Sequence, residues 1–151
     1  MKVLIISDSH SRLDNLMKIW EKEVPDVVIS AGDYSKDVEE LSYVYENSKY
    51  YIVRGNCDYM DHNTEDILEF ELSGKKIFLT HGHLYGVKTS YDYLRMEAKD
   101  RGNDLCIFGH THVPYLEEEE MILFNPGAVK DGLYGILNIN NDEINIEHRK
   151  L

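Results

Sequence analysis

The amino-acid sequence predicts an α/β fold of two sheets packed face to face, with helices on the outside. Two features of the chain predict it. Up to residue 55, short apolar runs alternate with segments of helical periodicity, which is the pattern of a β-α-β-α-β unit on a parallel sheet. Beyond that point short strand-like runs dominate, and a second sheet accommodates them. The 151 residues are expected to form a single domain, 1–151.

The first part of the chain is expected to hold three strands and two helices. Residues 3–7 read VLIIS, a continuous apolar run that is typical of a strand buried on both faces. Residues 12–23 place apolar side chains at helical spacing, and Pro25 breaks the pattern. The remaining elements expected here are a strand at 27–30, a helix at 37–46 and a strand at 50–55.

The second part is expected to hold one helix, at about residues 90–99, among a series of strands. The acidic run Glu117–Glu120 is expected to cap the exposed end of a strand, because a charge run usually faces solvent. Strand-like runs occupy residues 67–72, 75–80, 104–109, 121–125, 134–139 and 144–149.

Composition and charge exclude several classes of function. No apolar run approaches the roughly 20 residues of a membrane-spanning helix. The opening MKVLIISDSH turns polar too early for a signal peptide, which favours a cytoplasmic location. The net charge of −12 repels nucleic acids and anionic membranes, so neither is an expected partner. Two cysteines, Cys57 and Cys106, indicate no disulfide framework.

Side chains able to bind metals follow five of the predicted strands. Because sites in open α/β sheets form beyond the carboxyl ends of the strands, we expect these side chains to converge although they are far apart in sequence. Carboxylate, imidazole and amide oxygen together suit manganese, iron, nickel or zinc, and the histidines must be neutral to bind. The residues concerned are Asp8, His10, Asp33, Asn56, His81, His83, His110 and His112.

Each of these short strings is common by itself, since Asp-x-His often caps a helix and Gly-Asp often forms a turn. In this order, however, DSH, GD, GNCD, THGH and GHTH, followed by NPGAV, resemble the calcineurin-like metallophosphoesterase superfamily, and most of all its compact single-domain phosphodiesterase branch. The resemblance runs from Val3 to about Ile139. It implies the metallo-dependent phosphatase fold, a four-layer α/β/β/α sandwich of two mixed sheets flanked by helices.

The resemblance also implies a function, which is hydrolysis of a small phosphate ester, foremost a phosphodiester, with two divalent metal ions per chain. A hydroxide bridging the two ions would attack phosphorus, while the ions offset the developing charge. One ion would be held by Asp8, His10 and His112, and the other by Asn56, His81 and His110, with Asp33 bridging both. The expected catalytic residues are Asp33, Asn56 and His81 from this ligand set, together with His83, which lies two residues after His81.

One position departs from the family pattern. Many members have histidine after the Asn of the GN motif, where it is proposed to stabilise the transition state or protonate the leaving group, and this chain has Cys57 there. A neutral thiol is a poor proton donor. His83 and Asp58 are the nearest candidates to compensate, although His83 could equally orient a metal ligand.

Two alternative functions stay open at this stage. A retromer subunit of the same fold serves as a protein-binding scaffold with little or no activity. A specific nucleotide or dinucleotide hydrolase is also compatible, because Tyr34, Tyr59 and Tyr85 follow metal motifs and could stack on a base. Lys88 and Arg54 could meet substrate phosphate or serve in structural ion pairs. Members of the branch often self-associate, so a homo-oligomer is a further possible partner.

Overall fold

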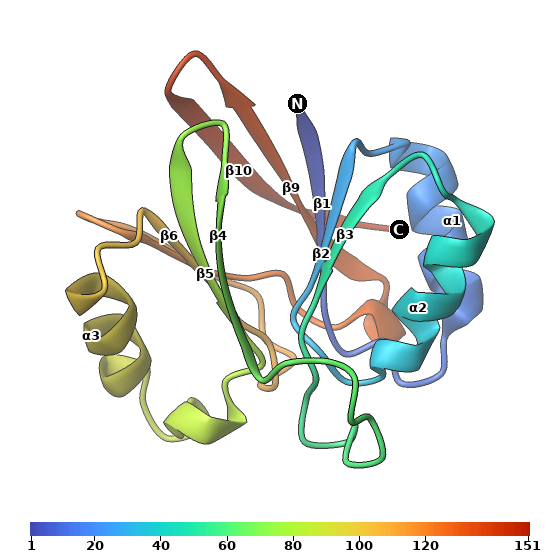
Figure 1. Ribbon diagram of the computed structural model, residues 1–151, viewed down its shortest axis with the longest axis horizontal. Coiled ribbons are helices and arrows are strands. Elements are labelled where there is room, and N and C mark those ends of the chain that lie inside the picture. The colour runs from blue at the N-terminus through green and yellow to red at the C-terminus, as the bar shows by residue number, and fades with distance from the viewer.

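The computed structural model describes residues 1–151 and contains two five-stranded sheets (Figure 1). The first sheet has the order β10 (Glu143–Lys150), β9 (Leu133–Asn140), β1 (Lys2–Ile6), β2 (Val27–Ser30) and β3 (Lys49–Ile52). The second has the order β4 (Ile67–Leu72), β5 (Lys75–Thr80), β6 (Leu105–Ile107), β8 (Ile122–Asn125) and β7 (Tyr115–Glu118).

Both sheets are mixed, as predicted. In the first, β1, β2 and β3 run parallel, while β9 is antiparallel to both β1 and β10. In the second, β5, β6 and β8 run parallel, and β4 and β7 are antiparallel edge strands. The helices are α1 (Leu13–Glu23), α2 (Ser35–Val44) and α3 (Asp92–Asp100), with short 3₁₀ turns η1 (His83–Tyr85) and η2 (Val129–Asp131).

Four layers result from this arrangement. Helices α1 and α2 cover the outer face of the first sheet, and α3 covers the outer face of the second (Figure 1). Along β1, Val3 and Ile5 pack between the sheets, while Leu4 and Ile6 pack beneath α1 and α2. This strand is therefore apolar on both faces, which explains its uninterrupted apolar sequence. The predicted four-layer sandwich is confirmed.

The sequence did not predict β7. Its glutamates, Glu117 and Glu118, belong to the acidic run, whose other two members lie in the turn before β8. Strand β7 lies at the edge of its sheet, where charged side chains are tolerated and discourage pairing with other chains. Glu117 also accepts two hydrogen bonds from Arg95 of α3, so the run ties the helix to the sheet edge. The first half of the run thus lies within strand β7, and the second half follows its exposed end.

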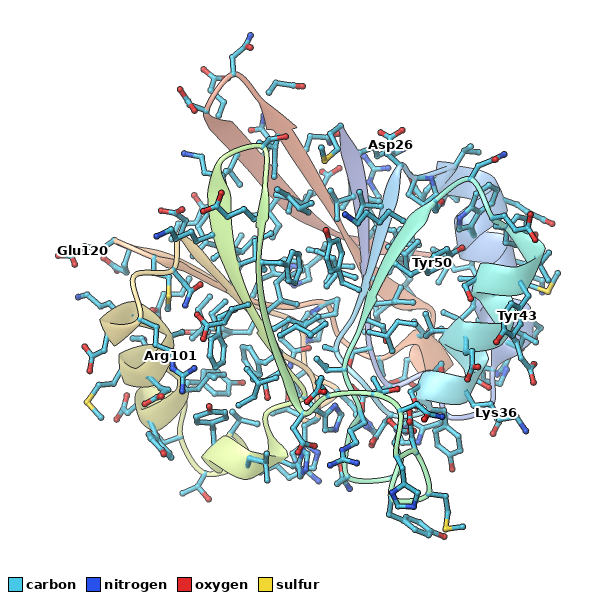
Figure 2. The ribbon with its side chains drawn as sticks, in the orientation of Figure 1. Asp26, Lys36, Tyr43, Tyr50, Arg101 and Glu120 are labelled. Atoms are coloured by element: carbon cyan, nitrogen blue, oxygen red, sulfur yellow. The ribbon has the colours of Figure 1, made fainter.

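The parallel strands carry their carboxyl ends to one edge of the molecule. In Figure 1 the loops that follow β1, β2, β3, β5 and β6 gather below the two sheets. Figure 2 shows Lys36, at the start of α2, near this edge, whereas Asp26 lies at the opposite end of the first sheet. No helix has both the length and the apolar character needed to cross a bilayer.

A buried carboxylate fastens α1 to the first sheet. Glu23 accepts hydrogen bonds from Lys2 Nζ (2.8 Å), Arg149 Nη1 (2.8 Å) and the Tyr134 hydroxyl (2.7 Å). Burial by itself would raise the pKa of Glu23, but these partners outweigh it and hold the pKa at about 2. A carboxyl group whose folded-state pKa is depressed stabilises the fold above its ordinary pKa, and the contribution is lost as the pH falls toward the folded-state value.

We therefore expect Glu23→Gln to lower the free energy of unfolding at neutral pH by about 2 kcal/mol. The deficit should shrink as the pH falls from about 5 to about 2, because wild-type Glu23 is protonated in that window. Urea denaturation at a series of pH values measures it. Glu21→Gln, an exposed change on the same helix, should stay within about 0.5 kcal/mol of wild type. A deficit that does not change with pH would contradict the assignment.

Candidate metal centre

The predicted metal-binding side chains meet at the edge where the parallel strands end. Asp8 and His10 follow β1, Asp33 follows β2, and His81 directly follows β5. Backbone hydrogen bonds connect these loops, among them Asp8 N–H to Gly32 O at 2.8 Å and Gly109 N–H to His81 O at 2.9 Å. The loops are therefore short continuations of the sheets rather than independent segments.

Asp8, His10 and His112 form the first group of donors. Nε2 of His112 lies 3.1 Å from Oδ1 of Asp8, and Nε2 of His10 lies 3.5 Å from the same oxygen. The two Nε2 atoms are 3.2 Å apart. Three donor atoms at these separations can share one cation.

Asn56, His81 and His110 form the second group. Nε2 of His81 lies 3.0 Å from Oδ1 of Asn56 and 3.1 Å from Nδ1 of His110. Nδ1 of His81 lies 2.7 Å from the carbonyl oxygen of Ala31. Because a carbonyl oxygen only accepts, Nδ1 carries a proton, and Nε2 is the nitrogen that faces the other donors.

Asp33 lies between the two groups. Its Oδ2 is 3.4 Å from Nε2 of His81 and 3.9 Å from Nε2 of His10. Its other oxygen, Oδ1, accepts the backbone N–H of Cys57 at 2.9 Å. Burial opposes ionisation, but His81 and the N–H of Cys57 hold the pKa of Asp33 well below its usual range. Asp33 is thus an ionised carboxylate positioned to contact both groups.

The chemistry of the donor set fits divalent cations. Asp8 is fully buried, and its Oδ2 accepts hydrogen bonds from Ser7 Oγ (2.5 Å) and His110 N–H (3.1 Å). Its Oδ1 is also buried but has no hydrogen-bond partner. An unpaired buried carboxylate oxygen is costly, and a cation among the surrounding histidine nitrogens would satisfy it.

Neutral imidazole is the form that binds metals. Burial, together with the charges of His81 and Lys88, lowers the pKa of His110 to about 4. Burial also lowers the pKa of His83. In the second group, His81 differs, because hydrogen bonding to Asp33 and the charge of Asp8 outweigh burial and raise its pKa. His81 is therefore the nitrogen ligand whose proton a bound cation would have to displace.

Five of the seven donor residues adopt left-handed backbone conformations, which sequence reasoning did not foresee. Such a conformation costs a residue other than glycine on the order of 1–3 kcal/mol. It persists only where the surroundings enforce it, and it turns the side chains of these loops toward one point. The residues and their φ angles are Asp8 (55°), His10 (44°), Asp33 (47°), His110 (71°) and His112 (63°).

At two positions near the carboxylates only glycine fits, because a Cβ there would collide with neighbouring side chains. A Cβ on Gly55 would lie 2.1 Å from Oδ1 of Asp33. A Cβ on Gly109 would lie 1.9 Å from Ser7 Oγ and 2.8 Å from Oδ2 of Asp8. Both contacts are far shorter than van der Waals separation, so any side chain at either glycine would displace a donor.

Asp58 binds backbone groups of the protein. Its carboxylate accepts three backbone N–H groups, those of Gly55 (2.7 Å), Ser35 (2.9 Å) and Asp33 (3.1 Å). It therefore connects the loops that follow β2 and β3, and its oxygens are occupied within the protein. These contacts hold the two loops together, and the suggestion that Asp58 compensates for the missing histidine stays a prediction.

Asn125, the first residue of NPGAV, supports the loop of His110 and His112. It is fully buried, and its amide group donates to Gly109 O (3.0 Å) and Thr111 Oγ1 (3.0 Å). The motif had been noted only as part of the family resemblance. Its side chain shapes the loop that carries two donor residues.

Cys57 and His83 lie on different sides of the centre. Cys57 is exposed, and partial desolvation with the adjacent Asp33 carboxylate raises its thiol pKa to about 11. His83 has a buried Nδ1 without a partner, and its ring centroid lies 5.5 Å from that of His81. His83 makes no hydrogen bond to any of the proposed metal ligands. A residue that orients a metal ligand would make such a bond. Arg54, for its part, is paired with Asp66 (2.7 Å).

Comparison with known proteins identifies the family. Residues 1–141 match the model of the calcineurin-like phosphoesterase superfamily domain. The probable metallophosphoesterase YsnB from Bacillus subtilis is 33% identical over 152 residues, covering 94% of this chain and 86% of the relative. The phosphodiesterase MJ0936 from Methanocaldococcus jannaschii is 31% identical, covering 92% of this chain and 90% of that protein.

Solved structures have the same fold. A predicted phosphoesterase from Streptococcus pneumoniae matches with a TM-score of 0.80 at 25% identity, covering 99% of this chain and 88% of that one. Zinc-bound Vps29 from Entamoeba histolytica matches with a TM-score of 0.77, covering 99% of each chain, but at 18% identity this likeness is one of fold alone. The family match over residues 1–141, with relatives above 30% identity, establishes that the chain belongs to the calcineurin-like phosphoesterase superfamily.

Proposed function

We propose that this protein hydrolyses phosphodiesters with two divalent cations, one at each group of donors, joined by Asp33. The single observation that supports this most is the position of Asp33, whose Oδ2 lies within 3.4 Å of His81 and 3.9 Å of His10. The unpaired Oδ1 of Asp8 supports it independently. The relatives named metallophosphoesterase and phosphodiesterase agree with the substrate class.

Bound cations would supply a water of lowered pKa as nucleophile and positive charge for the phosphate oxygens. The protein contributes orientation. Ser7 and the His110 N–H hold one oxygen of Asp8, which leaves the other facing the histidines. Ala31 fixes the tautomer of His81. These contacts set the donor atoms in place before a substrate arrives, which is the main source of catalytic power in such sites.

We further propose that His83 contacts the substrate rather than a ligand. Its Nδ1 has no hydrogen-bond partner in the protein, and burial lowers the pKa of the imidazole. His81 already has Ala31 as the partner of its Nδ1, so His83 is not needed to orient it. His83 is not among the seven proposed metal ligands, so it is the histidine beside the centre that is left to act on the substrate, from the side opposite Cys57.

The scaffold alternative has less support. The chain has a complete set of donors in contact distance, and its likeness to Vps29 extends to the fold alone. Manganese, nickel, iron and zinc all remain candidate ions for this donor set. A single-domain chain, a cytoplasmic location and self-association are further proposals that follow from the family.

We expect Asp33→Asn and His81→Ala to lower manganese- or nickel-dependent hydrolysis of bis-p-nitrophenyl phosphate by at least about 100-fold. Both should stay folded, because loop ligands contribute little to the apolar layers. Elemental analysis should report fewer than two ions per chain. Asp100→Asn, an exposed carboxylate at the end of α3, serves as the matched control and should match wild type. Near-normal activity of either ligand variant in metal-replete buffer would refute the assignment.

We expect Gly55→Ala to lower the same activity by about 100-fold, because its Cβ would push Oδ1 of Asp33 out of place. Gly74→Ala is the control. Gly74 has a φ of +81° with no atom near its Cβ position, so alanine there should cost about 1 kcal/mol of stability and no activity. If Gly55→Ala retained full activity, the position of Asp33 would not limit catalysis.

We expect Cys57→His to raise kcat most for substrates with poor leaving groups, by about tenfold for a phenyl diester and less for a p-nitrophenyl diester. The side chain is exposed, so an imidazole has room. Comparing kcat for both esters measures the effect, and Cys57→Ser should resemble wild type. A fall in kcat for both esters would mean that imidazole at this position obstructs the site.

A further inference from the structure

A groove of about 520 Å³ opens beside the metal centre. The segment from Val87 to Tyr91 forms one side, and Thr111 and Val113 form the other. Thr111 is the residue between the donors His110 and His112, so the groove adjoins the loop that carries one donor of each group. Its volume is in the range of pockets that bind small ligands. Neither the proposed ligands nor His83 line it, so the function described so far leaves it without a role.

The groove is free of acidic side chains. Although the chain has 28 carboxylate residues and a net charge of −12, none of them lines this groove. Its one charged side chain is Lys88. The groove is therefore locally positive in an otherwise acidic protein.

Lys88 differs from the arginines of this chain in having no carboxylate partner. All five arginines form ion pairs, namely Arg12 with Asp14, Arg54 with Asp66, Arg95 with Glu117, Arg101 with Glu69 and Arg149 with Glu23. Each of these guanidinium groups thus already has a carboxylate beside it. The exposed ammonium group of Lys88 therefore has no competing anion from the protein.

The walls of the groove combine hydroxyl groups with fixed apolar surface. Thr89 and Ser90 stand next to Lys88 and provide donors for anionic oxygens. Tyr91 packs edge-on against Phe108 and Tyr115, with ring centroids 5.0 Å and 4.7 Å away, which holds its ring in place. A cation and hydroxyl groups beside an ordered ring suit a ligand with an organic body and an anionic end.

A second groove, of about 350 Å³, lies on the other side of the centre and has the opposite character. It is lined by Tyr34, Cys57 and Met60, and although Lys36 contributes to it, so do the carboxylates Glu39, Asp58 and Asp61. An anionic group would be repelled there. A phosphodiester with its phosphorus at the donor groups would thus meet different surroundings on its two sides, and of the two grooves only that of Lys88 favours a negatively charged group.

We propose that the groove of Lys88 binds a second anionic group, such as a phosphate, carried by one ester group of the substrate. The preferred substrates are then phosphodiesters with an additional negative charge on one side. This inference rests on the proposed phosphodiesterase function, which identifies the neighbouring donors as the place where the reacting phosphate binds.

Two substrates that release the same chromophore test it. One is the p-nitrophenyl phosphodiester of thymidine, and the other is the same compound with a phosphate on the remaining deoxyribose hydroxyl. Wild type should hydrolyse the phosphorylated compound with about tenfold higher kcat/KM, mainly through KM, and this preference should decrease with added salt. Lys88→Ala should abolish the preference, and Lys88→Arg should restore it.

Lys36→Ala is the matched control, because it removes an exposed lysine from the groove on the other side, and it should leave the preference unchanged. Equal kcat/KM for the two compounds in wild type would overturn the inference while leaving phosphodiester hydrolysis intact. Equal losses on both compounds in Lys88→Ala would also overturn it, since Lys88 would then act on the reacting phosphate. Hydrolysis of neither compound would refute the proposed function and this inference together.

Discussion

The metal centre depends on two carboxylates that the fold buries without fully pairing them. Asp8 is fully buried and Asp33 is 3% exposed, yet Oδ1 of Asp8 has no hydrogen-bond partner. Burying an ionised carboxylate without a counter-charge is among the most unfavourable things that a protein can do. The first sheet imposes this placement because both residues lie in the short loops that follow its inner strands β1 and β2. A pair of cations would neutralise these buried charges. Cation binding would therefore stabilise the folded protein through these two residues.

The backbone around these carboxylates is also under strain, and the apolar layers sustain it. Asp8 and Asp33 adopt left-handed conformations that most residues avoid. Both begin loops only a few residues beyond strands that are almost completely buried. Rigid strands can enforce a conformation that a longer loop would relax. The short loops therefore hold the two carboxylates in defined positions. Gly55 and Gly109 leave the space that these carboxylates occupy.

Much of this arrangement could be predicted from the sequence, because two local patterns carry long-range information. Uninterrupted apolar runs such as VLIIS indicated buried parallel strands, and the residues that follow such strands must meet at one edge. The strand β7 escaped prediction because its glutamates contribute charge where a strand pattern expects apolar residues. They are tolerated only because the strand is at an edge beside Arg95, which is a tertiary fact.

The roles of supporting residues were beyond the reach of the sequence for a related reason. Arg54 and Asp58 both belong to the loop after β3, and both had been considered for contact with substrate or for catalysis. Arg54 pairs with Asp66, and Asp58 collects three backbone N–H groups, so each contributes to the shape of the loop. Residue type cannot distinguish a side chain that points into a site from one that holds the site together. That distinction depends on which backbone groups the fold leaves unpaired.

The overall charge poses a problem that only local features can solve. At a net charge of −12, the molecule repels an anionic phosphate ester at long range, and salt screens this repulsion beyond about 8 Å. Within that distance the arginines cannot help, because carboxylates already neutralise them. Two sources of positive charge could then act at this edge, which are the cations that the donor groups would bind and Lys88 in a groove without acids, whereas Lys36 lies among carboxylates. The first acts on any phosphate that reaches the centre, whereas the second can discriminate between substrates. Chemistry and selectivity would then rest on separate charges, and each could change without loss of the other.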